Sequence, residues 1–441
     1  MRRTFVAIAV FVTSIFSGAC AFAQSDPLYV PLGPAKGVLY RPDHGPAPHV
    51  GIVVMHRTVN YLSHPACTEF ARRGYEVLCM NSRFDNNEVR VVWEQTALDV
   101  KAGIEFLKRQ PGISKVLLFG HSGGGPTMAF YEAVAENGIA FCQAPERLTT
   151  CTNELAGLPK ADGIVFADAH PGYPMTVLRG LNGSIIDEDH PDRIDPTLDP
   201  FSPANGYDPK GASHYSEDFQ RRYFKAQSDR MNRIIARALD ARERIRSGTS
   251  IYPDNDIVVI PRGGNPVGGP GGTGSLHVLE PSIASIMSTA RPEKLVQNDG
   301  SIVTRIVSSV ARPEPDLAET NRTFNTGTKI YSVNSFLSAN AVRSTNSLDG
   351  IEHCSSNNST VCAVQSISVP ELFLAMGAGD FIRDNEMTYD VAKSADKDYA
   401  VIEGATHFFT PCGPCEPTPG AYANSRKNLF DFAAKWIDAR F

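Results

Sequence analysis

The sequence has no excess of positive charge, no internal repeat and no long apolar run beyond its N-terminus. Its 42 lysine and arginine residues are outnumbered by 48 aspartate and glutamate residues, and the net charge is -6. Nucleic-acid binding usually needs a basic surface, which this balance disfavours. We therefore expect no nucleic-acid partner. A chain of 441 residues can form one large domain or two modest ones.

The N-terminus carries a short basic start and an apolar run that ends in Ala21, Phe22 and Ala23. Small residues at the first and third of these positions are typical of a signal peptidase cleavage site. We therefore predict a signal peptide over residues 1–23 and export to the periplasm or the medium. An uncleaved membrane anchor is the alternative, which the shortness of the run disfavours. After cleavage we expect no stable membrane insertion.

Nine cysteines are present, and removal of Cys20 with the leader leaves eight. An even number in an exported chain favours disulfide bonds. Three pairs lie close together in loop-like segments: Cys142 with Cys151, Cys354 with Cys362, and Cys412 with Cys415. The other two, Cys67 and Cys79, fall on an expected helix and an expected strand, where they can remain buried thiols.

Strand-like apolar runs alternate with helical segments. The strands are expected at 49–56, 75–81, 115–121, 163–169, 371–378 and 399–407, and the helices at 63–73, 91–109, 124–137 and 423–439. Near-continuous apolarity along strands indicates a sheet that is covered on both faces. This alternation predicts an α/β fold with a mostly parallel central sheet and helices on both faces.

A long segment of different character interrupts this alternation. We expect residues 176–365 to form an inserted cap, between an N-terminal core part at 24–175 and a C-terminal core part at 366–441. The cap contains an acidic loop at 185–200 and an arginine-rich helix at about 216–246. The acidic loop lacks a recognisable cation-ligand spacing, so a solvated loop is the favoured interpretation.

The segment that carries chemistry is the Gly-His-Ser-Gly-Gly-Gly run around Ser122, between an apolar strand and a helix. A serine nucleophile must protrude from a tight turn to reach a substrate carbonyl. Such a turn needs small residues two positions before and two after the serine, where Gly120 and Gly124 stand. The amide of Gly123, at the start of the helix, can then donate to a developing oxyanion.

This motif resembles the nucleophile elbow of the α/β-hydrolase superfamily of serine hydrolases. The resemblance covers about 36–175 and 365–441, and it implies a triad ordered as serine, acid and histidine. His407 looks like the superfamily's histidine because it follows a strand in a Glu-Gly-x-x-His segment. Asp380, after the preceding strand, looks like its acid. Asp168 and Asp384 also lie near strand ends, and Asp168 is the compatible second choice.

The second oxyanion donor implied by the resemblance comes from the loop after an early strand, which commonly begins His-Gly. Here His56 and Arg57 occupy those positions, so the expected oxyanion hole is Gly123 with Arg57. A bulky cation departs from the usual pattern. The Arg57 side chain could instead meet an anionic group of the substrate or pair with a local carboxylate.

Together these features predict an exported serine hydrolase that cleaves a carboxylic ester in a small-molecule substrate, with no metal or organic cofactor. An amidase, peptidase or lactonase would use the same triad. The Cys-Gly-Pro-Cys run at 412–415 raises a different alternative, a thiol-disulfide protein. Because these cysteines follow the His407 segment in a proline-rich coil, we favour a disulfide that stiffens that loop.

Overall fold

The computed structural model describes residues 26–210, 213–253, 255–263, 287–311 and 327–441. The predicted signal peptide and Cys20 lie outside these residues. No helix within the described ranges is both long and apolar enough to cross a bilayer.

A single ten-stranded sheet organises the core, in the order β1-β2-β4-β3-β5-β6-β13-β14-β8-β9. Its strands are β1 (Leu28–Leu32), β2 (Ala35–Tyr40), β3 (Val50–His56), β4 (Glu76–Asn81), β5 (Lys115–His121), β6 (Gly163–Ala167), β8 (Glu293–Val296), β9 (Ile302–Arg305), β13 (Glu371–Met376) and β14 (Lys397–Ile402). The strands from β4 to β8 in this order pair in parallel, whereas β1, β2 and β9 join antiparallel. Parallel pairing brings the carboxyl ends of the central strands to one edge.

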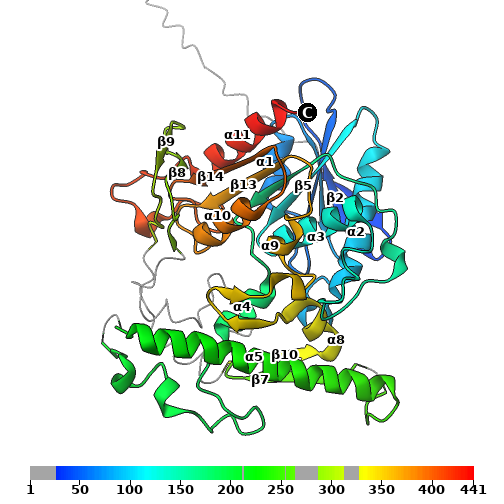
Figure 1. The fold of residues 1–441 in the computed structure, drawn as a ribbon. Coiled ribbons are helices and arrows are strands. Elements are labelled where there is room, and N and C mark those ends of the chain that lie inside the picture. The colour runs from blue at the N-terminus through cyan, green and yellow to red at the C-terminus, as the bar shows by residue number, and fades with distance from the viewer. Residues whose placement is uncertain (1–25, 211–212, 254, 264–286, 312–326) are drawn as a thin grey trace, which may run out of the picture.

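Helices cover both faces of this sheet, as the sequence predicted. One face packs against α2 (Trp93–Lys108), α3 (Gly124–Asn137) and α10 (Ile382–Val391), and the other against α1 (Pro65–Ala71) and α11 (Ser425–Asp438). The fold class is therefore confirmed: a mostly parallel sheet between two helical layers (Figure 1).

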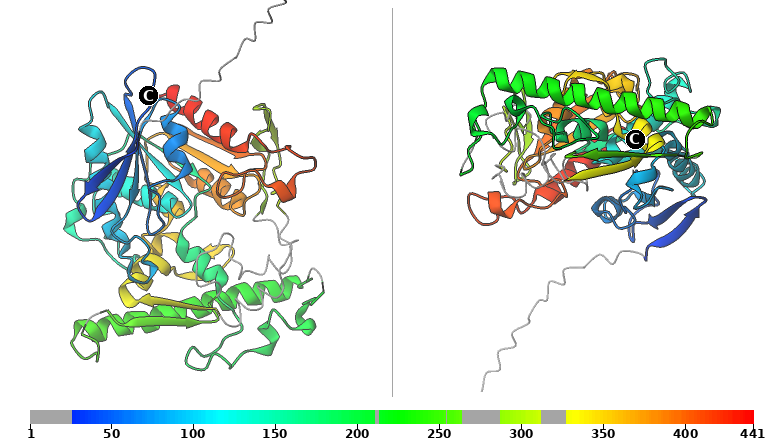
Figure 2. Two further views of the ribbon diagram at one scale, coloured as in Figure 1. Left: turned by 180° about the vertical axis from the view of Figure 1, so that it is seen from behind. Right: turned by 90° about the horizontal axis from the view of Figure 1, so that it is seen from below.

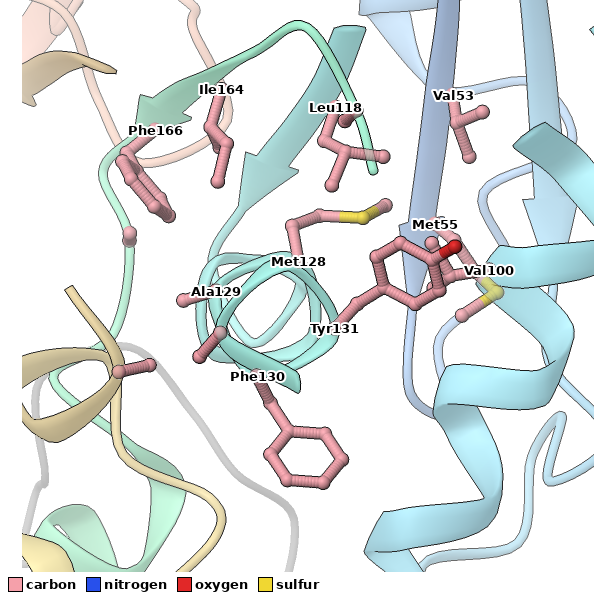
Figure 3. Close-up of a cluster of buried hydrophobic side chains, with 14 of the residues drawn as sticks. Val53, Met55, Val100, Leu118, Met128, Ala129, Phe130, Tyr131, Ile164 and Phe166 are labelled. Carbon is pink, nitrogen blue, oxygen red and sulfur yellow. The ribbon is translucent and has the colours of Figure 1, made fainter. Parts of the chain in front are cut away.

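Helix α3 matters most for the site because it begins directly after Ser122. Its side chains Met128 and Phe130 are fully buried, in one cluster with Leu118 of β5 and Phe166 of β6. Figure 3 shows α3 end-on, with Met128 directed toward the strand that carries Leu118. Dense apolar packing of this kind is stiff, so it holds the N-terminus of α3 at a fixed position against the sheet.

The sheet is wider than the sequence indicated. Strands β1 and β2 were not expected, and β8 and β9 lie inside the segment predicted to be the cap. Strand β8 pairs in parallel with β14 through Leu295 and Val296, while β9 has every residue exposed. The segment 176–365 therefore contributes an edge of the core sheet, and the role of the rest as a cap stays a prediction.

The remainder of that segment lies across the carboxyl edge of the sheet (Figures 1 and 2). It contains α4 (Tyr173–Gly180), the long α5 (Glu217–Arg246), and a two-stranded sheet of β7 (Ile257–Pro261) and β10 (Thr328–Ser332). Smaller elements are α8 (Val333–Ser335), a π-helical turn (Phe336–Asn340), β11 (Ser344–Asn346), β12 (Gly350–Ile351) and α9 (Thr360–Ala363). An apolar cluster of their own joins α4, α5, β7, β10, α8 and the π-helical turn, whereas Ala363 of α9 belongs to the cluster of the core.

One arginine of α5 is buried, although the arginines of a charged helix face are usually solvated. Arg230 is fully buried and pairs with Glu188 of the acidic loop at 2.8 Å. Its Nη1 atom also donates to the carbonyl oxygens of Asn182 and Arg262. Part of the acidic loop is thus tied to α5 instead of being freely solvated, and within the described ranges no cluster of acidic, histidine or cysteine residues suits a metal ion.

The eight cysteines outside the leader form four bonded pairs. Three are the expected ones: Cys142 with Cys151, Cys354 with Cys362, and Cys412 with Cys415. The fourth corrects the sequence interpretation, because Cys67 of α1 is bonded to Cys79 of β4 and neither is a free thiol. Their Cα atoms lie 6.1 Å apart, so this disulfide ties α1 to the sheet it covers.

Candidate active site

Ser122 stands in the turn between β5 and α3, as predicted. Its φ angle is 56°, a left-handed conformation that a residue with a Cβ seldom adopts. The turn is tight: a Cβ atom at Gly120 would lie 2.7 Å from the Gly125 Cα, and one at Gly124 would lie 2.5 Å from the Met55 carbonyl oxygen. The two glycines therefore permit the close approach of α3 to β3 and β5 that makes the serine protrude.

His407 meets Ser122 from the loop after β14. The distance from Ser122 Oγ to His407 Nε2 is 3.0 Å, within hydrogen-bonding range. On the other side of the imidazole, Nδ1 lies 2.6 Å from Oδ2 of Asp168. A carboxylate at Nδ1 keeps the proton there and leaves Nε2 free to accept the serine proton. The structure therefore has Ser122 and His407 in contact, as the sequence predicted.

The acid at His407 is Asp168, not Asp380, which corrects the sequence prediction. Asp168 directly follows β6, is fully buried and has a φ angle of 44°. Its amide donates to the Leu374 carbonyl at 2.7 Å, and its Oδ1 accepts from the Met376 amide at 3.2 Å. The neighbouring strand β13 thus fixes the carboxylate while its other oxygen faces His407.

Asp380 lies close by, after the Gly-Ala-Gly turn that ends β13. Burial, and after it the negative charge of Asp168, raise the pKa of Asp380 to about 6 against the opposing effect of His407. A second carboxylate beside a buried one is unfavourable when both are ionised. Asp380 is therefore a neighbour of the triad that is costly to ionise. The other sequence candidate, Asp384, pairs with Arg179 at 2.8 Å and so connects α10 to α4.

This geometry predicts a pH-dependent stability. The folded pKa of Asp380 lies above its unfolded value, so the folded state holds the proton more tightly, and the free energy of unfolding falls as pH rises from about 4 to about 6. Asp380→Asn removes the ionisable carboxyl group, and with it this fall in the free energy of unfolding. In urea unfolding we expect the variant to match the wild type at pH 4 and to exceed it by up to roughly 3 kcal/mol at pH 7.

Asp349→Asn, at an exposed position, is the matched control: it keeps Asp380, so its stability should fall with rising pH as that of the wild type does. Wild-type and Asp380→Asn stabilities that differ by a constant amount from pH 4 to pH 8 would contradict the ionisation of Asp380 as the cause.

A second histidine, which sequence reasoning missed, also contacts Ser122. His170 Nε2 lies 3.1 Å from Ser122 Oγ. Its backbone is fixed on both sides, because its amide donates to the Ser122 carbonyl at 3.0 Å and its carbonyl accepts from Thr360 at 2.6 Å. The ring packs on Phe381, and burial lowers its pKa well below the usual value, so the ring is neutral.

The two histidines therefore hold Ser122 Oγ from two directions. When the Ser122 hydroxyl donates a hydrogen bond to His407 Nε2, the neutral His170 ring can donate a hydrogen bond from its Nε2 to a lone pair of Ser122 Oγ. Its position two residues after Asp168, just past the end of β6, was the only sequence signal for it.

A chain of buried groups supports the His407 loop. His64 Nδ1 accepts from the Ala66 amide, so its Nε2 carries the proton and donates to His121 Nδ1 at 3.0 Å. His121 in turn donates from Nε2 to the His407 carbonyl at 2.8 Å. Burial lowers the pKa of His64 to about 3 and that of His121 well below its usual value. Both rings are neutral, as this hydrogen-bond order requires.

The Cys412–Cys415 disulfide lies C-terminal to His407, in the loop that follows β14. The Cys412 amide donates to the Gly404 carbonyl at 2.9 Å, and the Thr406 amide donates to the Thr410 carbonyl at 2.8 Å. Cys412 directly precedes a 3₁₀ turn, Gly413–Cys415, that ends at Cys415, and no α-helix begins there. A thioredoxin-type site would place its first cysteine at a helix N-terminus, so this placement favours a stiffening disulfide.

We expect reduction of Cys412–Cys415, or the double change to serine, to lower kcat by about two- to tenfold without producing reductase activity. The bond closes a short loop and adds little global stability, but it restrains the segment that positions His407. Steady-state kinetics with and without reductant, alongside an insulin-reduction assay, measure both effects. Peptide mapping of protein purified without reductant that recovers both cysteines as free thiols would refute the prediction.

Gly123 and the end of β3 lie where the sequence predicts the oxyanion hole. A Cβ atom at Gly123 would lie 2.5 Å from His56 Nε2, so this imidazole packs directly against the turn. His56 Nδ1 accepts the amides of Thr58 and Val59 at 3.1 and 2.9 Å. Burial lowers the pKa of His56 well below its usual value. The neutral ring therefore carries its proton on Nε2, beside the Gly123 amide.

The Arg57 side chain is only 2% exposed. Its guanidinium lies 3.9 Å above the Tyr173 ring, and its Nη2 is 3.0 Å from Glu88 Oε2. The Ser82 hydroxyl donates to its carbonyl oxygen. Of the alternatives raised by the sequence, the local carboxylate is therefore present, and the role of the Arg57 amide as an oxyanion donor stays a prediction.

Comparisons with known proteins find no matching family model and no matching curated protein. Solved structures do match over most of the chain at low identity. DcsB, in complex with its substrate analogue, has a TM-score of 0.43 at 10% identity, over 92% of this chain and 94% of that chain. Est1E from Butyrivibrio proteoclasticus has a TM-score of 0.40 at 8% identity, over 94% of this chain and 99% of that chain. The monoacylglycerol lipase of Paleococcus ferrophilus has a TM-score of 0.38 at 12% identity, over 92% of this chain and 99% of that chain.

The assignment of the fold rests on the chain's own geometry. A mostly parallel sheet lies between two helical layers, and a strained serine turn joins β5 to α3. An aspartate after β6 and a histidine after β14 meet at that serine in the order along the chain that the motif implies. The chain therefore has the architecture of the α/β-hydrolase fold.

Proposed function

We propose that this chain is an exported serine hydrolase that cleaves a carboxylic ester through Ser122, His407 and Asp168. The observation that carries the proposal is the continuous contact from Ser122 Oγ through the His407 ring to Asp168, at 3.0 and 2.6 Å. A serine hydroxyl gains nucleophilic strength only when a base is positioned to remove its proton, and this contact supplies that base.

In the acylation step, Ser122 Oγ attacks the ester carbonyl and its proton passes to His407 Nε2. Asp168 stabilises the imidazolium that forms, and the proton then moves to the departing alcohol oxygen. The tetrahedral oxyanion is stabilised by the Gly123 amide at the start of α3, with the predicted donor from Arg57. The product of this step is an acyl-Ser122 ester.

In the deacylation step, water takes the place of the alcohol. His407 removes a proton from the water, the resulting hydroxide attacks the acyl carbonyl, and the same proton returns to Ser122 Oγ as the acid leaves. Neither step calls for a metal or an organic cofactor.

Export is part of the proposal and rests on the sequence of residues 1–23. The four cysteine pairs are compatible with it, because disulfides persist in oxidising compartments.

A serine-directed organophosphonate tests the proposal directly. We expect one covalent adduct per chain, on the peptide that contains Ser122, with loss of activity on p-nitrophenyl esters in proportion to labelling. Amide and lactone panels run in parallel distinguish an esterase from the alternatives with the same triad. Labelling of a cysteine peptide instead would support the thiol-disulfide alternative.

A further inference from the structure

The histidine that contacts Ser122 besides His407 has one ring nitrogen without a partner. His170 Nε2 lies 3.1 Å from Ser122 Oγ, whereas its Nδ1 is buried and has no hydrogen-bond partner among the described residues. The ring packs on Phe381 with 4.7 Å between the ring centroids, and the Thr360 hydroxyl donates to the His170 carbonyl. The contact with Ser122 therefore decides which nitrogen of this ring carries the proton.

The hydrogen-bond balance at Ser122 Oγ places that proton on Nε2. The serine hydroxyl has one proton, and His407 Nε2 accepts it because His407 Nδ1 donates to Asp168 at 2.6 Å. A proton on His170 Nδ1 would leave a buried N–H unpaired and would turn a second acceptor toward the same hydroxyl. Burial lowers the pKa of His170 well below its usual value, so the ring carries only one proton. His170 is therefore a neutral donor to Oγ.

The two histidines leave one direction at Oγ free. Their rings reach the oxygen from separate directions, with 5.9 Å between the ring centroids. In the resting enzyme the hydroxyl proton faces His407 and one lone pair accepts from His170, so the second lone pair remains for the substrate carbonyl carbon. In the tetrahedral intermediate Oγ is bonded to that carbon, and its two lone pairs face the His407 imidazolium and the His170 N–H. The His170 contact thus persists through turnover.

The strength of this contact differs between the steps. In the acyl-enzyme, Oγ is an ester oxygen and a poor acceptor, because its lone pair is delocalised into the carbonyl group. When the bond from the acyl carbon to Oγ breaks in deacylation, the electron pair returns to Oγ, which takes the proton from His407. His170 keeps its own proton and donates a stronger hydrogen bond to the more negative oxygen. An interaction that strengthens from the ground state to the transition state accelerates that step.

Acylation gains less from the same donor. Oγ already accepts from His170 in the free enzyme, so the hydrogen bond is present both before and during the attack on the ester carbonyl. An interaction of equal strength in both states leaves the rate of that step unchanged. Loss of the His170 N–H should therefore affect the two steps unequally.

We propose that His170 is a catalytic residue of deacylation, whose Nε2–H donates to Ser122 Oγ and makes this oxygen a better leaving group when the acyl-enzyme is hydrolysed. This role depends on the proposed function of Ser122, because deacylation is one of its two steps. It differs from the roles of His407 and of the oxyanion hole, because His170 acts on the leaving oxygen and transfers no proton.

Replacement of His170 by leucine and by glutamine tests the donor. Leucine removes the N–H, whereas the side-chain amide of glutamine can place an N–H close to the position of His170 Nε2. With p-nitrophenyl butyrate we expect His170→Leu to slow the decay of acyl-Ser122 by about tenfold or more, measured by quenched flow and intact mass. His170→Gln should recover most of the decay rate. Labelling by an organophosphonate, which reports attack by Oγ, should stay within about threefold of the wild-type rate in both variants.

Steady-state kinetics distinguish this role from a structural one. When deacylation limits turnover, His170→Leu should lower kcat and KM together and keep kcat/KM, which reports acylation, within about threefold of the wild type. A displaced Ser122 would lower kcat/KM instead. The matched control is His49→Gln, because His49 is an exposed histidine directly before the amino end of β3, at the opposite edge of the sheet from Ser122. This variant should leave kcat and KM unchanged.

A measurement on the wild type avoids any dependence on the folding of a variant. NMR of protein with isotope-labelled histidine should find the His170 proton on Nε2. A proton on Nδ1 would overturn the deacylation role, and so would acyl-Ser122 that decays equally fast in the wild type and in folded His170→Leu protein, while the proposed function stood. A wild type that forms no acyl-Ser122 with any ester would overturn the proposed function itself, and with it the role of His170.

Discussion

Ser122→Ala is expected to reduce ester hydrolysis by a factor of about a thousand or more while leaving the fold intact. The nucleophilic oxygen is lost, and with it the hydrogen bonds to His407 and His170. Stability should change little because alanine, like serine, carries a Cβ atom in the left-handed conformation at position 122, so the backbone cost is present in both proteins. Burst kinetics with a p-nitrophenyl ester, together with a thermal melt, measure the two effects.

The same variant should also lose the organophosphonate adduct. His407→Ala serves as the companion variant, because it removes the base and keeps the serine, so slow residual labelling of Ser122 is expected there. Retention of wild-type turnover in Ser122→Ala would eliminate this serine as the nucleophile, whatever the condition of the rest of the site.

Most of the central sheet could be predicted from the sequence because its buried strands are continuous apolar runs. Strand β5 was expected at 115–121 and lies at Lys115–His121, and α3 was expected at 124–137 and lies at Gly124–Asn137. The edge strands were missed for the opposite reason. Strand β9 is exposed along its whole length, so it needs no apolar run, and β8 has only four residues.

Within the site, Ser122 and His407 were predictable because local sequence determines their setting: a glycine-rich turn after a buried strand for one, a loop after a buried strand for the other. The acid was not, because β6 and β13 are adjacent parallel strands, with Ala167 opposite Leu374. An aspartate follows each strand at the same edge of the sheet: Asp168 directly after β6, and Asp380 after the Gly-Ala-Gly turn that follows β13. Which carboxylate reaches His407 depends on backbone geometry beyond the strand ends, which no local pattern encodes.

His170 and the Cys67–Cys79 bond were missed because each depends on a long-range approach. His170 reaches Ser122 because β6 lies beside β5, with Ala167 opposite His121. Cys67 meets Cys79 because α1 packs on β4. A single sequence contains the two partners of each contact but not the distance between them.

Asp168→Asn is expected to lower kcat by roughly a thousand- to ten-thousandfold, whereas Asp380→Asn should stay within about threefold of the wild type. Asparagine is close in shape to aspartate, and its side-chain oxygen can still accept the Met376 amide that Asp168 Oδ1 accepts now. The amide group would then face His407 Nδ1, where the carboxylate oxygen lies at 2.6 Å. An amide donor there favours the tautomer with its proton on Nε2, and that tautomer cannot accept a proton from Ser122.

Asp380→Asn is the matched control because it makes the same chemical change in the carboxylate next to Asp168, without altering the hydrogen bond to His407. Burial is the main cause of the raised pKa of Asp380 and the charge of Asp168 adds to it, so a modest shift in the pH profile of kcat/KM is expected, with little change in the maximum rate. Steady-state kinetics of both variants between pH 5 and pH 9 separate the two residues. A severe loss of kcat in Asp380→Asn together with near-normal kcat in Asp168→Asn would identify Asp380 as the acid of the triad. Only the carboxylate that orients His407 can have the larger effect.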